Sequence, residues 1–289
     1  MKNRIEYILF ISFSLFFRAM GLYLSRRFAV IIAIIFFFII PIRKTVTVNN
    51  IKKAFPHLDS KKVKKIAFRS YKSFAITLAE IMLLPSMTRE SMMKLLKCTN
   101  LELISKKFEE GNGVILLSAH FGNWEYGANS VSLQANKKFT IIVKNLRNPL
   151  VSEWMNKMRT KWLNEVVSLG VSVRQIYNDL KEKNIVAMIA DQRGPEDSIK
   201  LEFFGRKTSV LVGPAVLSLK TGAPLVFGIA VRQKDYSYKM NIVEISKDDL
   251  PDENNDKIEE LSRRHLYYLE SVIRENPEQW LWMHNRWKH

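Results

Sequence analysis

The stretch from Gly113 to Glu125, GVILLSAHFGNWE, constrains the fold more than any other part of the chain. Val114 to Leu117 follow a Gly-Asn-Gly turn, and four apolar residues in this position predict a short strand buried on both faces. The segment from Asn123 to Leu133 predicts a helix that Asn123 caps. The stretch therefore predicts a strand, a short turn and a helix in immediate succession.

His120 and Glu125 lie at the junction of this strand and helix. In one continuous helix, residues five apart lie about 140° apart around the axis and do not share a face. If His120 ends the strand and the chain turns at Gly122, the Glu125 carboxylate comes within reach of the imidazole ring. A carboxylate on one ring nitrogen fixes the tautomer and leaves the other nitrogen as a general base. We therefore assign the catalytic roles to His120 and Glu125.

A second interpretation explains the same residues without catalysis. His120 is then a histidine at a strand end, and Glu125 is a first-turn acid that the helix dipole favours. No G-x-S-x-G motif accompanies the histidine, and the single cysteine, Cys98, lies in a polar stretch. No H-E-x-x-H or C-x-x-C motif is present, so we expect no metal. A base without a protein nucleophile suits a reaction in which the substrate brings its own hydroxyl.

The charge of the chain predicts an anionic partner. The length of the chain, 289 residues, is enough for one α/β domain with a sizeable core and an appendage. Forty-five Lys and Arg against 28 Asp and Glu give a net charge of +17. Nucleic acid, an anionic membrane surface and an acidic carrier protein all fit this charge. A single cysteine excludes an intramolecular disulfide.

The N-terminal part is the most apolar, and only Arg18, Arg26 and Arg27 interrupt residues 7–42 with charge. The uncharged stretches 7–17 and 28–42 are each shorter than the ~20 residues that span a bilayer. Either one helix over residues 7–24 spans the membrane, or both stretches lie half-buried in one leaflet. We predict a membrane anchor at 1–44 and a catalytic α/β domain at 45–289. The Lys and Arg residues that follow the anchor place this domain on the cytoplasmic face.

Strand and helix patterns alternate through the middle of the chain. The strands are expected at 139–143, 171–173 and 185–190, and the helices at 151–162 and 176–183. This alternation predicts a largely parallel sheet with helices on both faces, whose strand C-termini carry the site. Asp191 ends the last of these strands, where it either positions a substrate hydroxyl, pairs with Arg193 or Arg159, or is a turn aspartate.

Two further groups of side chains fit either function or packing. Lys144, Arg147 and Arg159 suit a phosphate-binding wall, although each alone is explained by exposed surface charge. The aromatic C-terminal segment contains Trp280, Trp282 and Trp287. Tryptophan at a membrane interface explains this segment, and so does packing against the core.

Motifs along nearly the whole chain resemble the lipid A biosynthesis (late, or secondary) acyltransferase family, within the His-x4-Asp/Glu membrane acyltransferases. The His-x4-Glu pattern in SAHFGNWE carries the resemblance, and further motifs follow in the family's order. They are NNIKKAFP (49–56), RNPL (147–150) before Arg159, ADQ (190–192), FFG (203–205), TGAPLV (221–226) and PEQWLWMHNRWK (277–288).

The resemblance implies a glycerolipid acyltransferase-like fold and a membrane-bound O-acyltransferase of the inner membrane. Its donor would be acyl–acyl carrier protein, its acceptor a phosphorylated lipid A precursor, with no cofactor and no nucleic acid. The family links an arginine at the place of Arg159 to substrate, whereas its usual arginine near position 144 is Lys144 here. We expect substrate contacts from residues of these motifs and of the strand ends: Arg159, Asp191, Lys144, Asn123, Gln192, Arg193, Phe204 and Gly205.

Other functions fit the sequence as well. The acceptor is alternatively another glycolipid, an aminolipid or a lysophospholipid. In a different class, the chain is a basic membrane-tethered protein that binds nucleic acid or anionic lipid without catalysis. Salt-sensitive nucleic-acid binding without thioester consumption would favour that alternative.

Overall fold

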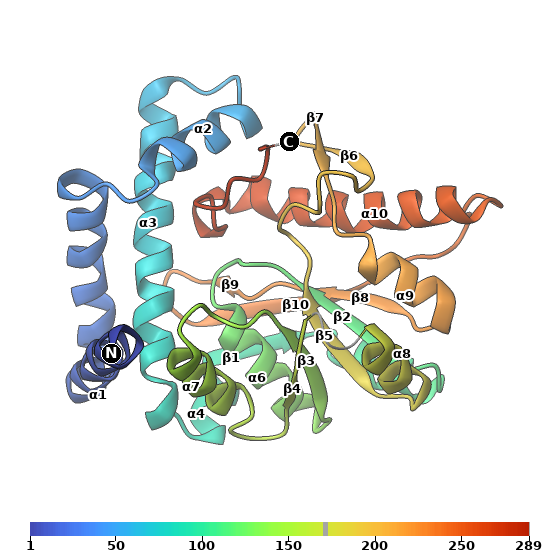
Figure 1. Ribbon diagram of the computed structural model, residues 1–289, viewed down its shortest axis with the longest axis horizontal. Helices are drawn as coiled ribbons and strands as arrows, with labels where there is room; N and C mark the ends of the chain where they lie inside the picture. The colour runs from blue at the N-terminus through green and yellow to red at the C-terminus, as the bar shows by residue number, and fades with distance from the viewer. Residues whose placement is uncertain (170–172, 289) are drawn as a thin grey trace.

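A mixed sheet flanked by helices forms the centre of the protein, as a computed structural model shows for residues 1–169 and 173–288 (Figure 1). The strand order is β1-β10-β8-β2-β5-β3-β4, and β9 pairs with β10. The strands of this sheet are β1 (Leu96–Thr99), β2 (Val114–Ser118), β3 (Phe139–Val143), β4 (Glu165–Ser168), β5 (Ile185–Ile189), β8 (Leu225–Gly228), β9 (Val231–Arg232) and β10 (Tyr238–Ile245). A separate hairpin contains β6 (Lys200–Phe203) and β7 (Arg206–Ser209).

Helices connect the strands and form the N-terminal part. The α-helices are α1 (Lys2–Ile34), α2 (Lys44–Ala54), α3 (Ser60–Met82), α4 (Arg89–Leu95), α5 (Glu102–Glu109), α6 (Trp124–Ala135), α7 (Pro149–Arg159), α8 (Val173–Lys181), α9 (Gly213–Thr221) and α10 (Asn254–Glu275). Three shorter helical segments are η1 (Ile35–Ile39), η2 (Leu84–Ser86) and η3 (Pro277–Gln279).

The central strand β2 pairs in parallel with both β5 and β8. β3 is parallel to β5 and β4, whereas β10 runs antiparallel to β8. The sheet is thus mostly parallel and covered by helices, which confirms the fold class that the alternating pattern predicts.

Alternate residues of β2 enter two different cores, because successive side chains of a strand point to opposite faces. Ile115 and Leu117 pack in a core with α8, α9 and α10. Val114 and Leu116 pack in a second core with α5, α6 and α7. Burial on both faces explains why this strand is a continuous apolar run.

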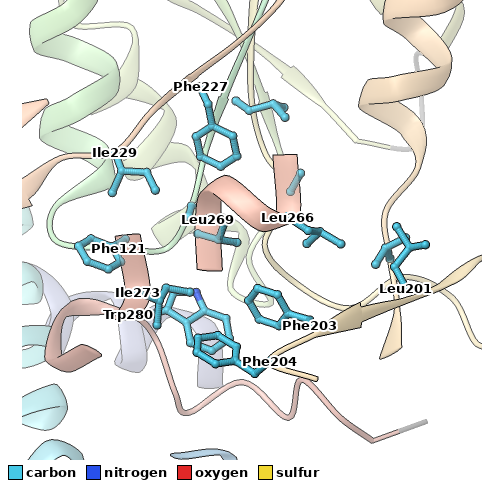
Figure 2. Packing of buried hydrophobic residues seen from close by; sticks show 14 of the residues in the cluster. Phe121, Leu201, Phe203, Phe204, Phe227, Ile229, Leu266, Leu269, Ile273 and Trp280 are labelled. Carbon is cyan, nitrogen blue, oxygen red and sulfur yellow. The ribbon is translucent and has the colours of Figure 1, made fainter. Parts of the chain in front are cut away.

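The C-terminal aromatic segment belongs to the first of these cores. Trp280, Trp282 and Trp287 are buried, with 3%, 0% and 8% of their surface exposed. Figure 2 shows Trp280 between Phe121 and the Phe203–Phe204 pair, beneath α10. The ring centroids of Trp280 and Phe203 are 5.7 Å apart. Packing is therefore the correct interpretation of this segment, and a position at a membrane interface is wrong.

One expected strand is not where the sequence pattern puts it. Of the expected strand 171–173, residues 171 and 172 lie outside the described residues, and Val173 begins α8. The strand that follows α7 is β4, which pairs with β3 from Glu165 to Ser168. Its two apolar residues lie between polar ones, so it lacks the apolar run that marks the central strands.

The N-terminal helix α1 is divided at Gly21, whose backbone angles (φ 67°, ψ 175°) are not helical. We call residues 2–20 the first arm and residues 22–34 the second arm. The arms run in different directions: the first is seen nearly end-on beside the N label in Figure 1, and the second runs along α3. By length and composition, Lys2–Ile39 is apolar enough to cross a membrane.

Gly122 lies in the turn after β2, and its replacement tests how closely this turn packs against its neighbours. Its φ is +54°, and a Cβ added there would lie 1.9 Å from the Ala230 carbonyl oxygen. Gly205 has a similar φ of +68°, but nothing lies within 4 Å of its Cβ position. Both Gly→Ala variants carry the backbone strain, and only Gly122→Ala adds a clash. We expect Gly122→Ala to lower the free energy of unfolding by about 1–3 kcal/mol more than Gly205→Ala, measured by denaturant titration. Equal losses would contradict this close packing.

Candidate active site

The pairing of β2 with β5 places His120 beside Asp191. Ser118 is opposite Ile189 in this parallel pair, so two residues further along each chain His120 meets Asp191. The His120 Nδ1 atom lies 2.8 Å from Asp191 Oδ1, and the His120 backbone N–H donates to Asp191 Oδ2 at 3.1 Å. Ring and backbone of the histidine are therefore both fixed by one carboxylate.

Asp191 is a buried carboxylate with three donors directed at it. Only 2% of the residue is exposed, and its third donor is Trp280 Nε1, 2.8 Å from Oδ2. Burial alone would raise its pKa, but the neighbouring His120 and the hydrogen bonds outweigh burial and lower the pKa of Asp191 below its usual value. Asp191 is therefore ionised at neutral pH, and its Oδ1 accepts a hydrogen bond from His120 Nδ1–H.

The His120 ring keeps an open side. Its side chain is 23% exposed, and the ring contacts the Trp124 ring edge-on at a centroid distance of 5.0 Å. Burial lowers the pKa of His120, but the negative charge of Asp191 and its hydrogen bond raise the pKa above the usual value overall. Since Asp191 occupies Nδ1, Nε2 is the nitrogen that can accept a proton from another molecule.

The expectation that Glu125 orients the His120 ring is wrong. Arg159 holds both oxygens of Glu125, with Nε 3.0 Å from Oε2 and Nη2 2.7 Å from Oε1. Because α6 begins at Trp124, Glu125 lies in its first turn and is directed toward α7. Asp191, and not Glu125, is the carboxylate hydrogen-bonded to His120 Nδ1. Glu125 still acts on His120 through its charge, which raises the histidine pKa, while Arg159 lowers it.

Asn123 is a buried structural residue, so our expectation that it contacts substrate is also wrong. Its exposed fraction is 0%. Its Oδ1 accepts from the Tyr126 backbone N–H at 3.0 Å, and its Nδ2 donates to Glu80 Oε2 at 3.0 Å. Both ends of the amide are engaged, because Asn123 caps α6 and ties that helix to α3.

Glu80 of α3 is a fully buried carboxylate that sequence reasoning missed. Besides Asn123, it receives Arg26 Nε from α1 at 2.8 Å and Arg232 Nη2 from β9 at 3.4 Å. The Tyr238 hydroxyl also donates to it. Its sequence neighbours show an ordinary amphipathic helix, and only the contacts between distant segments reveal the cluster.

The remaining expected substrate residues are dispersed. Lys144 is exposed beyond the end of β3, and Gln192 and Arg193 are half-buried directly after Asp191. Phe204 and Gly205 form the turn between β6 and β7, where the Phe204 ring packs against Phe55 at 5.3 Å. Phe204 is part of the core that contains α10, whereas Gly205 is exposed at the turn.

Two hollows are found in the structure, and only the smaller one is lined by His120. A cavity of about 10 Å³ lies between α3 and the C-terminal segment, with His120, Trp124 and Ser73 among its lining residues. A larger hollow of about 390 Å³ lies between α7 and β4, lined by residues that include Asn145 and Asn156. Within residues 1–169 and 173–288, no group of three or more His, Cys, Asp or Glu could hold a metal ion.

The protein is an α/β protein with a mostly parallel sheet and a histidine–carboxylate pair at adjacent strand ends. The chain belongs to the bacterial lipid A biosynthesis acyltransferases, since the model of this family matches residues 2–289. Its relatives are named acyltransferases, and the protein is accordingly an acyltransferase that acts on a lipid acceptor.

The relatives act on different lipids. The chain is 23% identical over 248 residues to the lipid A biosynthesis palmitoleoyltransferase of Escherichia coli (strain K12). The match covers 85% of this chain and 79% of the relative. It is 21% identical over 251 residues to the lauroyltransferase of the same strain, with the same coverage. It is 26% identical over 163 residues to a phosphatidylinositol mannoside acyltransferase of Mycobacterium tuberculosis (strain CDC 1551 / Oshkosh), covering 54% of this chain and 51% of that protein.

The two carboxylates near His120 predict different shifts of its pKa. Replacing Asp191→Asn removes the main cause that raises this pKa, and Glu125→Gln removes a smaller one. We therefore expect the His120 pKa, measured by NMR titration of the ring in detergent micelles, to fall further in Asp191→Asn than in Glu125→Gln. The reverse order would show that Glu125 is the dominant partner.

The ion pairs of the fully buried Glu80 predict that replacing it has a large effect on stability. In Glu80→Gln the Arg26 and Arg232 side chains, which are 11% and 7% exposed, lose their counter-charge. We expect the free energy of unfolding to fall by about 3–5 kcal/mol. Glu259→Gln is the matched control, because its partner Arg263 is half exposed and such a pair contributes about 0–1 kcal/mol. Similar losses in both variants, measured by denaturant titration, would refute the role of the cluster.

Proposed function

We propose that the protein transfers a fatty acyl chain from an acyl carrier protein thioester to a hydroxyl of a lipid A precursor. His120 is the general base, and Asp191 orients it. The observation that carries this proposal is the 2.8 Å contact between His120 Nδ1 and Asp191 Oδ1, which leaves Nε2 free to act.

The chemistry balances without a covalent enzyme intermediate. His120 Nε2 takes the proton from the acceptor hydroxyl as its oxygen attacks the thioester carbonyl. When the tetrahedral intermediate collapses, the carbon–sulfur bond breaks and the departing thiolate takes the proton back from His120. The buried Asp191 stabilises the imidazolium between these steps, since its carboxylate remains ionised.

The chemistry of Cys98 supports direct transfer. Burial, with the charge of Glu102, raises the pKa of this thiol to about 12, so it is protonated at neutral pH. It lies on β1, at the edge of the sheet opposite β4. A thiol in this state is a poor nucleophile, so the attacking group is better supplied by the acceptor.

The net charge of +17 supports both proposed partners, because acyl carrier protein and a phosphorylated lipid are acidic. Lys144 and Arg147 are exposed on the turn after β3, at the same edge of the sheet as His120, and we propose that they meet acceptor phosphate. We also propose that Arg159, which binds Glu125 in the structure, contacts the substrate. We also propose that the enzyme works on the cytoplasmic face of the inner membrane.

A second acceptor class has its own support. The mannoside acyltransferase relative is as similar over its matched region as the lipid A enzymes are over theirs. The acceptor is then another glycolipid, and the role of His120 is unchanged. Mass spectrometry of lipids from cells with and without the protein separates the two, since only the true product loses one acyl chain when the protein is absent.

Replacing His120→Ala tests the proposed base. We expect acyl transfer from acyl–acyl carrier protein, assayed in isolated membranes, to fall by at least about 10²–10⁴-fold. His57→Ala is the matched control, because His57 is exposed on the segment between α2 and α3. The acyl transfer activity of this variant should equal that of the wild type. Turnover retained in a folded His120→Ala protein would remove this mechanism.

A further inference from the structure

The first arm of α1 lies along the catalytic domain over its whole length. Near its start, Asn148 Nδ2 donates to the Asn3 carbonyl oxygen at 2.9 Å and to Glu6 Oε2 at 3.0 Å. Further along, the Phe10 and Trp154 rings meet at 4.9 Å. Both contacts join the arm to the beginning and middle of α7.

The far end of the same arm is also held. Ser14 Oγ donates to the Met82 carbonyl oxygen at 2.9 Å, and Arg18 Nε donates to Ser86 Oγ at 2.9 Å. Together with Asn3, Glu6 and Phe10, these residues recur every three or four positions and form one face of the helix. This face extends about 22 Å, roughly three-quarters of the ~30 Å thickness of a bilayer core.

If this arm crossed the bilayer, its partners would enter the lipid with it. The partner helix α7 carries the Glu153–Lys157 ion pair, whose side chains are 63% and 69% exposed. Placing these charges in the bilayer core costs several kcal/mol. The contacts therefore exclude an orientation across the membrane and favour one along its surface.

The opposite face of the first arm is apolar and exposed. Ile5, Ile8, Leu9 and Phe16 are each 44–62% exposed. They recur at helical spacing away from the contact face. No described residue of the catalytic domain covers them, so this face is available to lipid.

The second arm and η1 continue this apolar surface. Arg26 joins the arm to the buried Glu80, and further along the Phe37 ring packs against Tyr71 of α3 at 5.1 Å. The outward side chains Phe38, Ile39 and Ile40 are 56–70% exposed. Figure 1 shows both arms on the same side of α3.

We propose that the two arms lie in the plane of one leaflet, and that the protein binds anionic phospholipid from one side without crossing the membrane. Exposed Lys2, Arg4, Arg27 and Arg43 adjoin the apolar face, and cations beside a buried apolar face are the pattern of an interfacial helix. This proposal decides between the two interpretations of the N-terminal sequence and does not depend on the identity of the acceptor.

Cysteine accessibility tests this placement in the full-length protein. In a Cys98→Ser background, Lys2→Cys, Ala19→Cys and Lys61→Cys report the start of the first arm, its end and the catalytic domain. A membrane-impermeant maleimide is applied to intact spheroplasts and to inverted membrane vesicles. We expect all three positions to react from one and the same side. Reaction of position 2 or 19 from the side opposite position 61 would overturn the proposal.

Vesicle flotation tests the lipid-facing surface itself. We expect Leu9→Glu and Phe38→Glu each to lower binding to vesicles of phosphatidylethanolamine and phosphatidylglycerol by at least about tenfold. Tyr267→Glu is the matched control, because Tyr267 is 77% exposed on α10. This variant should bind the vesicles as well as the wild type does. Equal binding by all variants, or a wild-type protein that stays off vesicles as a dimer, would contradict the proposal. Acyl transfer measured in detergent micelles tests the proposed function separately.

Discussion

The parallel pairing of β2 with β5 is the constraint on which the site depends. This register places His120 and Asp191 side by side just beyond the ends of their strands. Their relative position is therefore set by strand pairing and not by a flexible loop. The neighbouring strands are buried on both faces, and a slip of one residue would move every apolar side chain to the wrong core. The packing that stabilises the sheet therefore also fixes the histidine–carboxylate pair.

The two carboxylates nearest His120 have different environments and different consequences. Asp191 binds the ring directly and is held by Trp280 from the C-terminal segment, which gives that buried segment a role at the site. Glu125 forms an ion pair with Arg159 and so joins α6 to α7. Behind them, Glu80 links the cap of α6 to α1, so a residue of the apolar N-terminal helix contacts the same network that supports the catalytic turn.

The sequence predicts the sheet, the strand–turn–helix unit at His120 and the position of Asp191 at a strand end, because these follow from local apolar runs and turns. It does not predict which carboxylate reaches the ring, since that depends on the pairing of strands some 70 residues apart. The same limit explains why Asn123 is misassigned as a substrate contact and why Glu80 is missed. β4 is missed for a local reason, since two valines between polar residues carry no clear period. The motif residues Phe204 and Trp280 pack in the core, and Trp280 also donates to Asp191.

A double-mutant cycle on His120 and Asp191 tests the central claim most directly. The measured quantity is kcat/KM for acyl transfer in the wild type, His120→Ala, Asp191→Asn and the double variant. If Asp191 acts only through the ring, the double variant loses no more activity than His120→Ala alone. If the two losses multiply, Asp191 acts independently of His120 and the account is contradicted.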